Sequence, residues 1–277
     1  MKLSALIHCR TFCFDFNPEF LVRPSDFTSD DIKWARELIL TTTSYCDEMV
    51  GRRYIIFNNN RYCILGIVSL LDDALRFFEF PEHDIEKYSF DENKRKIKCF
   101  FGFVFHVSDK QKGMLPETNK EYYYKLLYKY VANDNIFFSQ NQPSIQADYC
   151  FETNLREIAN NKNMDFYCLS SEKNDADMFE RLLAEVSSTK NISFCSNVYN
   201  LKMLEDGKYK YFTSNPNTIQ RFVKKEEEEK KAGEALLREE EHGQNNKKES
   251  KKKDDLKVVY AIIAVILLVV ITLIILL

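Results

Sequence analysis

The pattern of hydrophobic and polar positions over residues 1–223 predicts strands and helices in mixed order. Apolar, β-prone runs predict a strand region over 2–16, a hairpin whose turn is Asn58–Asn60, and a central strand over 96–107. Asparagine suits the turn because it tolerates the left-handed backbone conformation that a short hairpin requires. This part of the chain therefore predicts a sheet that contains at least one antiparallel hairpin.

Two longer segments have helical periodicity. The first follows Thr28, where the sequence TSDD has the form of a capping box, and Gly51 is well placed to end it. The second opens at 115–118 and repeats tyrosine, leucine and valine four residues apart as far as Val131. We interpret this aromatic stripe as part of the core, with a binding surface as the alternative.

The last part of this region predicts a strand, a helix and a strand joined by short loops, the pattern of a right-handed crossover between parallel strands. A short helix is expected before it, near 152–160, and a terminal hairpin after it, around Asp206-Gly207. The mixture of hairpins and crossovers predicts an α/β (mixed α+β) fold, with one globular domain whose mixed sheet is flanked by helices. The crossover consists of 164–169, 175–186 and 192–198.

Two segments beyond residue 223 differ in composition from this body. Residues 224–257 carry eleven basic and eleven acidic residues, and their i, i+4 pairs predict a solvent-exposed helix as far as about Glu241. Residues 258–277 carry no charge and predict a transmembrane anchor from Val258 to Leu277, because a helix of this length spans about 30 Å. The alternative, a buried soluble helix, would need a folded partner around it.

The flanks of the predicted anchor favour a cytoplasmic body, because basic residues beside a membrane span stay on the cytoplasmic side. The basic residues also place positive charge where anionic lipid headgroups would lie. This layout resembles that of tail-anchored single-pass membrane proteins, and the resemblance covers the C-terminal segment only. It implies insertion after translation, with nothing folded beyond the membrane. The flanking residues are Lys251, Lys252, Lys253 and Lys257.

Composition and charge narrow the function classes. The net charge of −3 and the isoelectric point of about 5.9 argue against a protein whose whole surface binds nucleic acid. The eight cysteines form no CxxC pair and lie mostly in apolar runs, so we expect reduced core thiols without a metal. His8 and Arg10 interrupt the apolar start of the chain, so no signal peptide is expected. No cofactor is predicted.

The sequence contains no motif typical of nucleotide binding, zinc proteases, serine hydrolases or calcium loops. His106 near Asp109 has the form of an acid–base pair, although a histidine satisfied at a strand end is the more common arrangement. Asp15 and Glu19 would form a carboxylate cluster for a divalent metal if the fold brought them to Asp72-Asp73. The sequence alone does not bring these groups together.

One loop has a physical case for ligand binding. It joins the carboxyl end of the predicted strand 164–169 to a helix N-terminus, where ligands of α/β sheets bind and free N–H groups favour anions. An ordinary helix-capping loop is the alternative interpretation. The candidate ligand-binding residues are Ser170, Ser171, Lys173 and Asn174.

These features favour a binding, sensor or adaptor module that the C-terminal segment holds at a lipid bilayer. Its partner would be another protein or a second copy, bound through residues 1–223, and no nucleic acid is expected. One alternative is a signal-activated effector that clusters and perturbs the bilayer, in the layout of some bacterial defence proteins. The other is a membrane-tethered hydrolase or nuclease with an unrecognised site. The absence of catalytic motifs favours the binding module.

Overall fold

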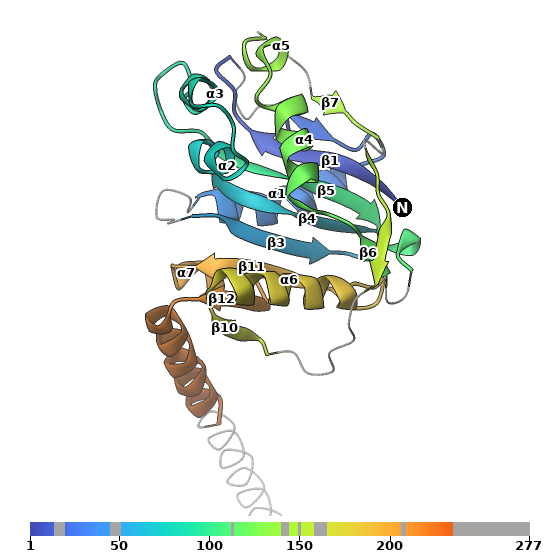
Figure 1. Cartoon of the computed structure of the whole chain (residues 1–277). Helices are drawn as coiled ribbons and strands as arrows, with labels where there is room; N and C mark the ends of the chain where they lie inside the picture. Colours follow the sequence, from blue (N-terminus) through green and yellow to red (C-terminus); the bar gives the residue numbers. More distant parts are fainter. Residues whose placement is uncertain are drawn as a thin grey trace, which may run out of the picture. The chain divides into compact units, whose positions relative to one another are not determined.

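The computed structural model describes residues 1–13, 20–44, 51–111, 114–139, 144–148, 151–157, 165–205 and 209–234. Contacts between residues divide the chain into two compact units, Met1–Arg221 and Phe222–Leu277. The first unit confirms the predicted mixed α/β fold, because it contains a large mixed sheet flanked by helices (Figure 1).

Ten of the described strands form the main sheet, in the order β10-β12-β11-β3-β4-β5-β1-β2-β7, with β8 beside β1. Strands β11, β3, β4, β5, β1 and β2 pair antiparallel, whereas β10, β12 and β11 are parallel to one another. The predicted central strand is β5, between β4 and β1. The bounds are β1 Lys2–Cys9, β2 Val22–Arg23, β3 Arg53–Asn58, β4 Tyr62–Leu70, β5 Lys98–His106, β7 Ile145–Gln146, β8 Phe151–Glu152, β10 Tyr167–Leu169, β11 Ser193–Val198 and β12 Tyr211–Ser214.

Helices cover both faces of this sheet (Figure 1). Trp34 of α1 packs on Phe57 of β3, while Phe179 of α6 packs on Tyr54 of the same strand. Because side chains alternate between the faces of a strand, α1 and α6 lie on opposite faces. The helices are α1 Ser29–Ser44, α2 Leu71–Phe77, α3 Glu82–Tyr88, α4 Lys120–Tyr130, α5 Asp134–Phe137, α6 Glu172–Glu185 and α7 Lys202–Glu205.

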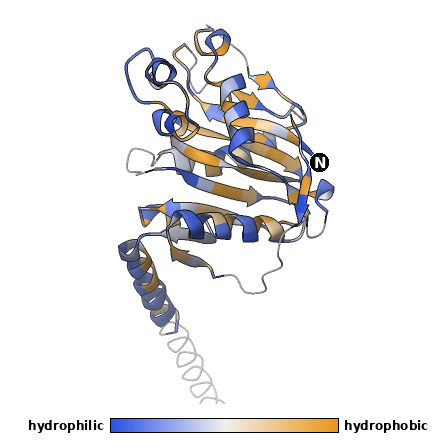
Figure 2. Ribbon diagram, viewed as in Figure 1, coloured by the Kyte–Doolittle hydropathy of each residue, from blue (hydrophilic) through white to orange (hydrophobic). Residues whose placement is uncertain are grey.

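The hydrophobic core confirms the interpretation of the aromatic stripe. Figure 2 shows hydrophobic strands beneath helices whose outer sides are hydrophilic. Four side chains of the stripe on α4 are buried, and so is one face of α6 with the residue that follows the helix. Those of α4 are Tyr123, Leu126, Leu127 and Tyr130, and those around α6 are Met178, Phe179, Leu182, Leu183 and Val186.

The structure confirms two local predictions, the capping box at Thr28 and the asparagine turn of the hairpin. The backbone N–H of Thr28 donates to the Asp31 carboxylate over 3.0 Å, and the Asp31 N–H donates to the Thr28 hydroxyl over 3.3 Å, which is a capping box at the start of α1. In the β3–β4 hairpin, the Asn59 side-chain oxygen accepts the backbone N–H groups of Arg61 and Tyr62. Each short polar side chain satisfies backbone groups that the adjacent element leaves unpaired.

A pair of glycines lies at the centre of the sheet. Gly66 of β4 and Gly102 of β5 are directly opposite in the register, and the ring of Phe100 lies against both positions. A Cβ atom on Gly66 would be 2.4 Å from the Phe100 ring, and one on Gly102 would be 2.3 Å from the Leu65 carbonyl oxygen. The missing side chains therefore leave room for the Phe100 ring against both strands.

Three predicted elements are wrong. The helix expected near 152–160 is replaced by β8 and by β9 (Leu155–Glu157), which pairs with β6 (Met114–Pro116). Residues 115–118 do not open a helix, because α4 begins at Lys120 after the Asn119 cap. The terminal hairpin is absent from the described residues, where α7 precedes a parallel strand, β12. In each case pairing with a distant strand decided the structure of a short segment whose own preference was weak.

The predicted crossover forms with one modification. Strands β10 and β11 are parallel and α6 connects them, but β12 lies between them in the sheet. Strand β12 thus pairs with both strands of the crossover, which do not pair with each other. This insertion places the carboxyl ends of three parallel strands beside the first turn of α6.

The described cysteines are free thiols, of which four are buried. Cys9 and Cys99 are opposite each other in the β1–β5 register. Burial, followed by the hydrogen bond with Cys9, raises the pKa of the Cys99 thiol, which keeps it protonated and unreactive. Cys46 and Cys150 lie outside the described residues.

The described part of the second unit is helical. A helix covers residues 216–234, and within it Lys224 and Lys225 pair with Glu228 and Glu229 at i, i+4 spacing. No helix in the described ranges is long and apolar enough to cross a membrane. The segment from Val258 to Leu277 lies outside those ranges, as do the lysines before it, so the anchor and its basic flank remain predictions.

We expect Gly102→Ala to lower the free energy of unfolding by about 3 kcal/mol, because its methyl group would meet backbone and a buried ring that cannot move apart. Chemical denaturation of the purified protein measures this change. Gly233→Ala is the control, because no atom lies within 4 Å of that position and the helix gains from alanine. Equal midpoints for Gly102→Ala and the unsubstituted protein would contradict the packing role.

Candidate functional site

The residues predicted to bind a ligand at the start of α6 mostly cap that helix. The Ser171 hydroxyl accepts the Asn174 N–H over 3.1 Å, and the Asn174 amide donates to the Leu169 carbonyl over 2.9 Å. Ser170 donates to the carboxylate of Asp175, while Lys173 is exposed. The fold brings these residues together in the capping loop that was the alternative interpretation, and ligand binding by them stays a prediction.

Behind this loop a buried carboxylate connects α6 to the parallel strands. Asp175 accepts the hydroxyl of Thr213 on β12 over 2.6 Å, and the same hydroxyl accepts the N–H of Asn197 on β11 over 2.8 Å. Burial raises the pKa of Asp175, and hydrogen bonds from Thr213 and Ser170 oppose that rise. Because its acceptor oxygens are occupied by the protein, we assign this carboxylate a structural role.

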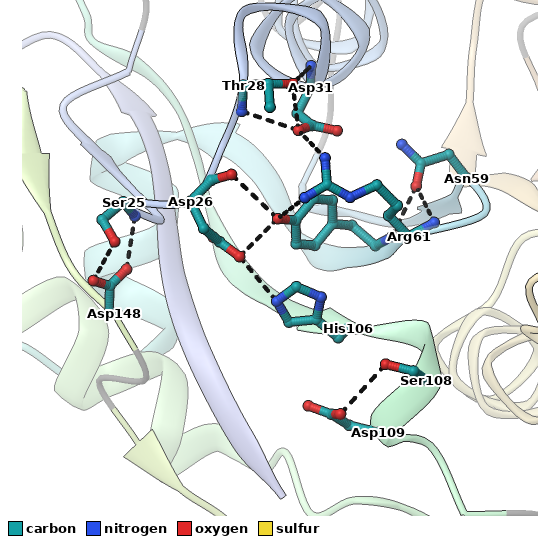
Figure 3. A network of polar contacts seen from close by, with 11 residues as sticks. Ser25, Asp26, Thr28, Asp31, Asn59, Arg61, His106, Ser108, Asp109 and Asp148 are labelled. Atoms are coloured by element: carbon teal, nitrogen blue, oxygen red, sulfur yellow. Dashed lines mark hydrogen bonds and ion pairs between the residues drawn. The ribbon is translucent and has the colours of Figure 1, made fainter.

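His106 does not pair with Asp109 but with Asp26, in the loop before α1 (Figure 3). The imidazole Nε2 is 2.9 Å from the Asp26 carboxylate, and the Tyr62 hydroxyl donates to the same carboxylate oxygen over 2.8 Å. Asp109 instead accepts the hydroxyl of Ser108. The sequence identified the histidine but not its partner, because 80 residues separate the two along the chain.

The pairing of β4 with β5 explains this arrangement. Tyr62 and His106 are opposite residues in the register, and their ring centroids are 4.6 Å apart. Arg61 extends the network, because its guanidinium donates to the Tyr62 hydroxyl over 3.1 Å and to Asp31 over 3.0 Å. Asp31, which caps α1, therefore also forms an ion pair with Arg61 of the β3–β4 hairpin (Figure 3).

The side chains of the Asp26–His106 network differ in their exposure to solvent. Burial, together with the hydrogen bond to Asp26, raises the pKa of Tyr62, so its hydroxyl stays protonated and donates. By contrast, the side chains of His106 and Asp26 are 26% and 45% exposed, respectively. A partly exposed imidazole that a carboxylate orients is suited to moving protons, and the same geometry also fixes the loop to the sheet.

The predicted carboxylate metal cluster has no support in the described residues. Asp72 forms an ion pair with Lys96 over 2.9 Å, and burial, with the adjacent Asp72 charge, raises the pKa of Asp73. Asp15 and Glu19 lie outside the described ranges. Within those ranges, no group of three potential ligands is placed to hold a metal ion.

A cavity of about 210 Å³ lies on the opposite face of the sheet from α1. Its floor includes Tyr54 of β3 and Ile67 of β4, and its walls come from the end of α2, the start of α4, α6 and β9. Five of the lining side chains are aromatic, and Arg156 and Glu180 at its edge form an ion pair of 2.9 Å. The aromatic residues are Tyr54, Phe77, Phe78, Tyr123 and Phe179.

Tyr123 is the feature of this cavity that sequence reasoning missed. Its side chain lines the cavity and is 5% exposed, and its hydroxyl has no hydrogen-bond partner among the described residues. Buried hydroxyl groups are almost always hydrogen-bonded in proteins. The helical stripe correctly predicted that Tyr123 is buried, but a stripe carries no information on the partner of its hydroxyl.

The function of this chain has to be argued from its own residues, because three comparisons with known proteins found no match. No family model, curated protein or solved structure matches this chain. Among the described residues, the Asp26–His106 network has the form of a site for proton transfer, and the aromatic cavity has the form of a binding site.

We expect Tyr62→Phe to lower the free energy of unfolding by about 2 kcal/mol, because it leaves the charged groups of Asp26 and Arg61 without their shared hydroxyl. Urea denaturation measures the change. Tyr128→Phe is the matched control, because Tyr128 is 58% exposed and its loss should change stability by less than about 0.5 kcal/mol. If both substitutions had the same small effect, the network would not stabilise the fold.

Proposed function

We propose that residues 1–221 form a small-molecule-binding module, and that the C-terminal segment holds this module at a membrane. The observation that carries the binding function is the cavity of about 210 Å³, which five aromatic side chains line together with Lys120, Arg156 and Glu180. An apolar pocket with a few polar groups is the usual form of a ligand site. In a module of this kind, ligand binding between α4 and α6 would act as the signal that a sensor transmits.

The membrane part of the proposal rests on the sequence. Residues 258–277 are uncharged over a length that suits a bilayer, and lysines precede them. The charged segment between the module and this anchor would serve as a spacer. The partner of the module, whether another protein or a second copy, would respond to the ligand-bound form.

A catalytic function is the second candidate, and the Asp26–His106 contact favours it. A hydrolase or nuclease would use His106 as a general base, oriented by Asp26. The Tyr62 hydroxyl also donates to Asp26, and Arg61 donates to that hydroxyl. The Asp26–His106 contact therefore serves equally well to fix the loop before α1 to the sheet. We rank binding first because the cavity offers an aromatic-lined space to a ligand, whereas side chains of the protein itself already contact Asp26.

We expect Ala176→Trp to abolish ligand binding to the module, because Ala176 is an exposed residue of α6 that lines the cavity and an indole there would fill the space. The assay is the thermal unfolding of the full-length protein in mild detergent with a panel of anionic, neutral and cationic small molecules. A ligand at 100 times its Kd adds about 2.7 kcal/mol of stability, which raises Tm by several degrees.

Lys173→Trp is the matched control for this experiment, because Lys173 is also exposed on the first turns of α6 but does not line the cavity. Ligands that stabilise the protein should still stabilise this variant. Stabilisation that Lys173→Trp removes and Ala176→Trp retains would move the site to the capping loop. A panel without any stabilising compound would count against the binding function.

We expect deletion of residues 258–277 to release a folded protein from membranes, because residues 1–221 form a compact unit with a hydrophobic core of their own. Cell fractionation with carbonate extraction measures the release, and the ligand-dependent rise in Tm should persist in the shortened chain. Replacement of the segment by an unrelated apolar helix should restore membrane association. Carbonate-resistant association of the shortened protein would refute the anchor.

A further inference from the structure

We propose that the cavity between α4 and α6 binds an uncharged compound with a single aromatic ring. This inference rests on the proposed binding function and specifies its ligand class. It follows from three properties of the cavity: its size, the aromatic side chains that a ligand can reach, and the pairing of the charges around it.

The size of the cavity selects a single ring. Its volume of about 210 Å³ is somewhat larger than an engineered cavity of about 150 Å³ that binds benzene. It is smaller than the pockets of about 300 Å³ and above that hold drug-sized ligands. One six-membered ring with one short substituent therefore fits, whereas a dinucleotide does not.

Two aromatic walls of the cavity are accessible to a ligand. Tyr54 of β3 and Phe77 of α2 line the cavity, and both side chains are only partly buried. Each packs edge-on against a buried ring, Tyr54 against Phe179 with centroids 5.6 Å apart and Phe77 against Phe78 at 4.8 Å. The buried partners hold the two accessible rings in place, so a ligand meets an aromatic surface that is already ordered.

This ordered surface favours an aromatic ligand over a saturated one. Aromatic rings gain from offset or edge-on packing beyond the area that they bury. A saturated ring of the same size buries as much apolar area but lacks that additional interaction. Ala176 of α6, a small and exposed residue, also lines the cavity, so this helix leaves room for the ring.

The charged side chains that line the cavity are paired. Lys120 at the start of α4 forms an ion pair of 2.6 Å with Glu79. Arg156 of β9 forms an ion pair of 2.9 Å with Glu180, which also lines the cavity. These two pairs contribute no net charge to the cavity.

Arg52 adds a third cation, and it has a carboxylate nearby. Its guanidinium carbon is 3.3 Å from the centroid of the Phe77 ring. Burial raises the pKa of Asp73, and the charge of Arg52 is among those that oppose this rise, which shows that the two groups lie close to each other. The two other cations that act on Asp73 are paired as well, Lys96 with Asp72 and Arg76 with Glu82.

This balance selects a ligand without net charge. A charged ligand would lose part of its hydration in the cavity and would meet no unpaired counter-charge among the described residues that line it. A cation would also find the Phe77 ring occupied, because Arg52 and Lys120 lie 3.3 and 5.0 Å from its centroid. A neutral aromatic ring avoids both costs.

The test compares four probes of similar size: benzamide, benzoate, benzylammonium and cyclohexanecarboxamide. We expect the full-length protein in mild detergent to bind benzamide about fivefold more tightly than either charged probe, because only these lose the hydration of a charge. Benzamide should also bind about fivefold more tightly than cyclohexanecarboxamide, which has the same amide on a saturated ring. Ligand-observed NMR titration measures the four affinities.

Two substitutions test the charge balance in opposite directions. Glu180→Gln leaves Arg156 unpaired, and it should raise the affinity for benzoate about threefold while that for benzamide stays within about twofold. Arg156→Gln leaves Glu180 unpaired and should do the same for benzylammonium. Glu185→Gln is the matched control, because Glu185 also lies on α6 in an ion pair but does not line the cavity. It should change none of the affinities.

Phe77→Leu tests the aromatic wall. It replaces an accessible ring by an aliphatic side chain, so the preference for benzamide over cyclohexanecarboxamide should fall to about twofold. Phe138→Leu is the control, because Phe138 is 40% exposed and does not line the cavity. It should retain the fivefold preference.

The outcomes separate this inference from the proposed function. Tighter binding of benzoate or benzylammonium than of benzamide by the unsubstituted protein would overturn the uncharged class, and equal affinities for benzamide and cyclohexanecarboxamide would overturn the aromatic class. If Ala176→Trp abolishes the binding in either case, the binding function stands and the ligand class alone is wrong. Absence of binding by all four probes and by the wider panel would overturn both.

Discussion

The antiparallel pairing of β4 with β5 is the constraint on which the rest of the first unit depends. The two strands pair from Tyr62 opposite His106 to Leu70 opposite Lys98, and the facing Gly66 and Gly102 let the Phe100 ring lie on the sheet between them. A slip by one residue would turn every side chain of a strand to the other face. It would also put side chains where the two glycines now leave room for the ring.

This one register positions a feature on each face of the sheet. On the face of α1, it sets Tyr62 beside His106 and so gives Asp26 two partners. On the opposite face, it places Ile67 in the floor of the cavity between α4 and α6. The network is closed by side chains from the protein itself, whereas the cavity leaves a space of about 210 Å³ between aromatic side chains. That difference is the physical reason to propose binding for the cavity and a positioning role for the network.

In two short segments, pairing with distant strands outweighs the conformational preference of the local sequence. Residues around 155 and the strand β12 gain their conformation from pairing with strands far away in the chain, Met114–Pro116 for one and β10 and β11 for the other. A segment of three or four residues gains little from its own preference, so a vacant strand edge decides its conformation. The predicted helix and hairpin failed at these places for that reason.

The sequence by itself determined the longer elements, the capping box at Thr28, the asparagine turn and the burial of the stripe on α4, because each depends on residues a few positions apart. It also predicts the membrane anchor and its charged spacer from composition. The tertiary structure alone decided that Asp26 pairs with His106, that β12 lies between β10 and β11, and that aromatic side chains from β3, α2, α4 and α6 surround one cavity. These facts join positions that lie far apart in the chain, and no local pattern records which distant groups the packing of a sheet brings into contact.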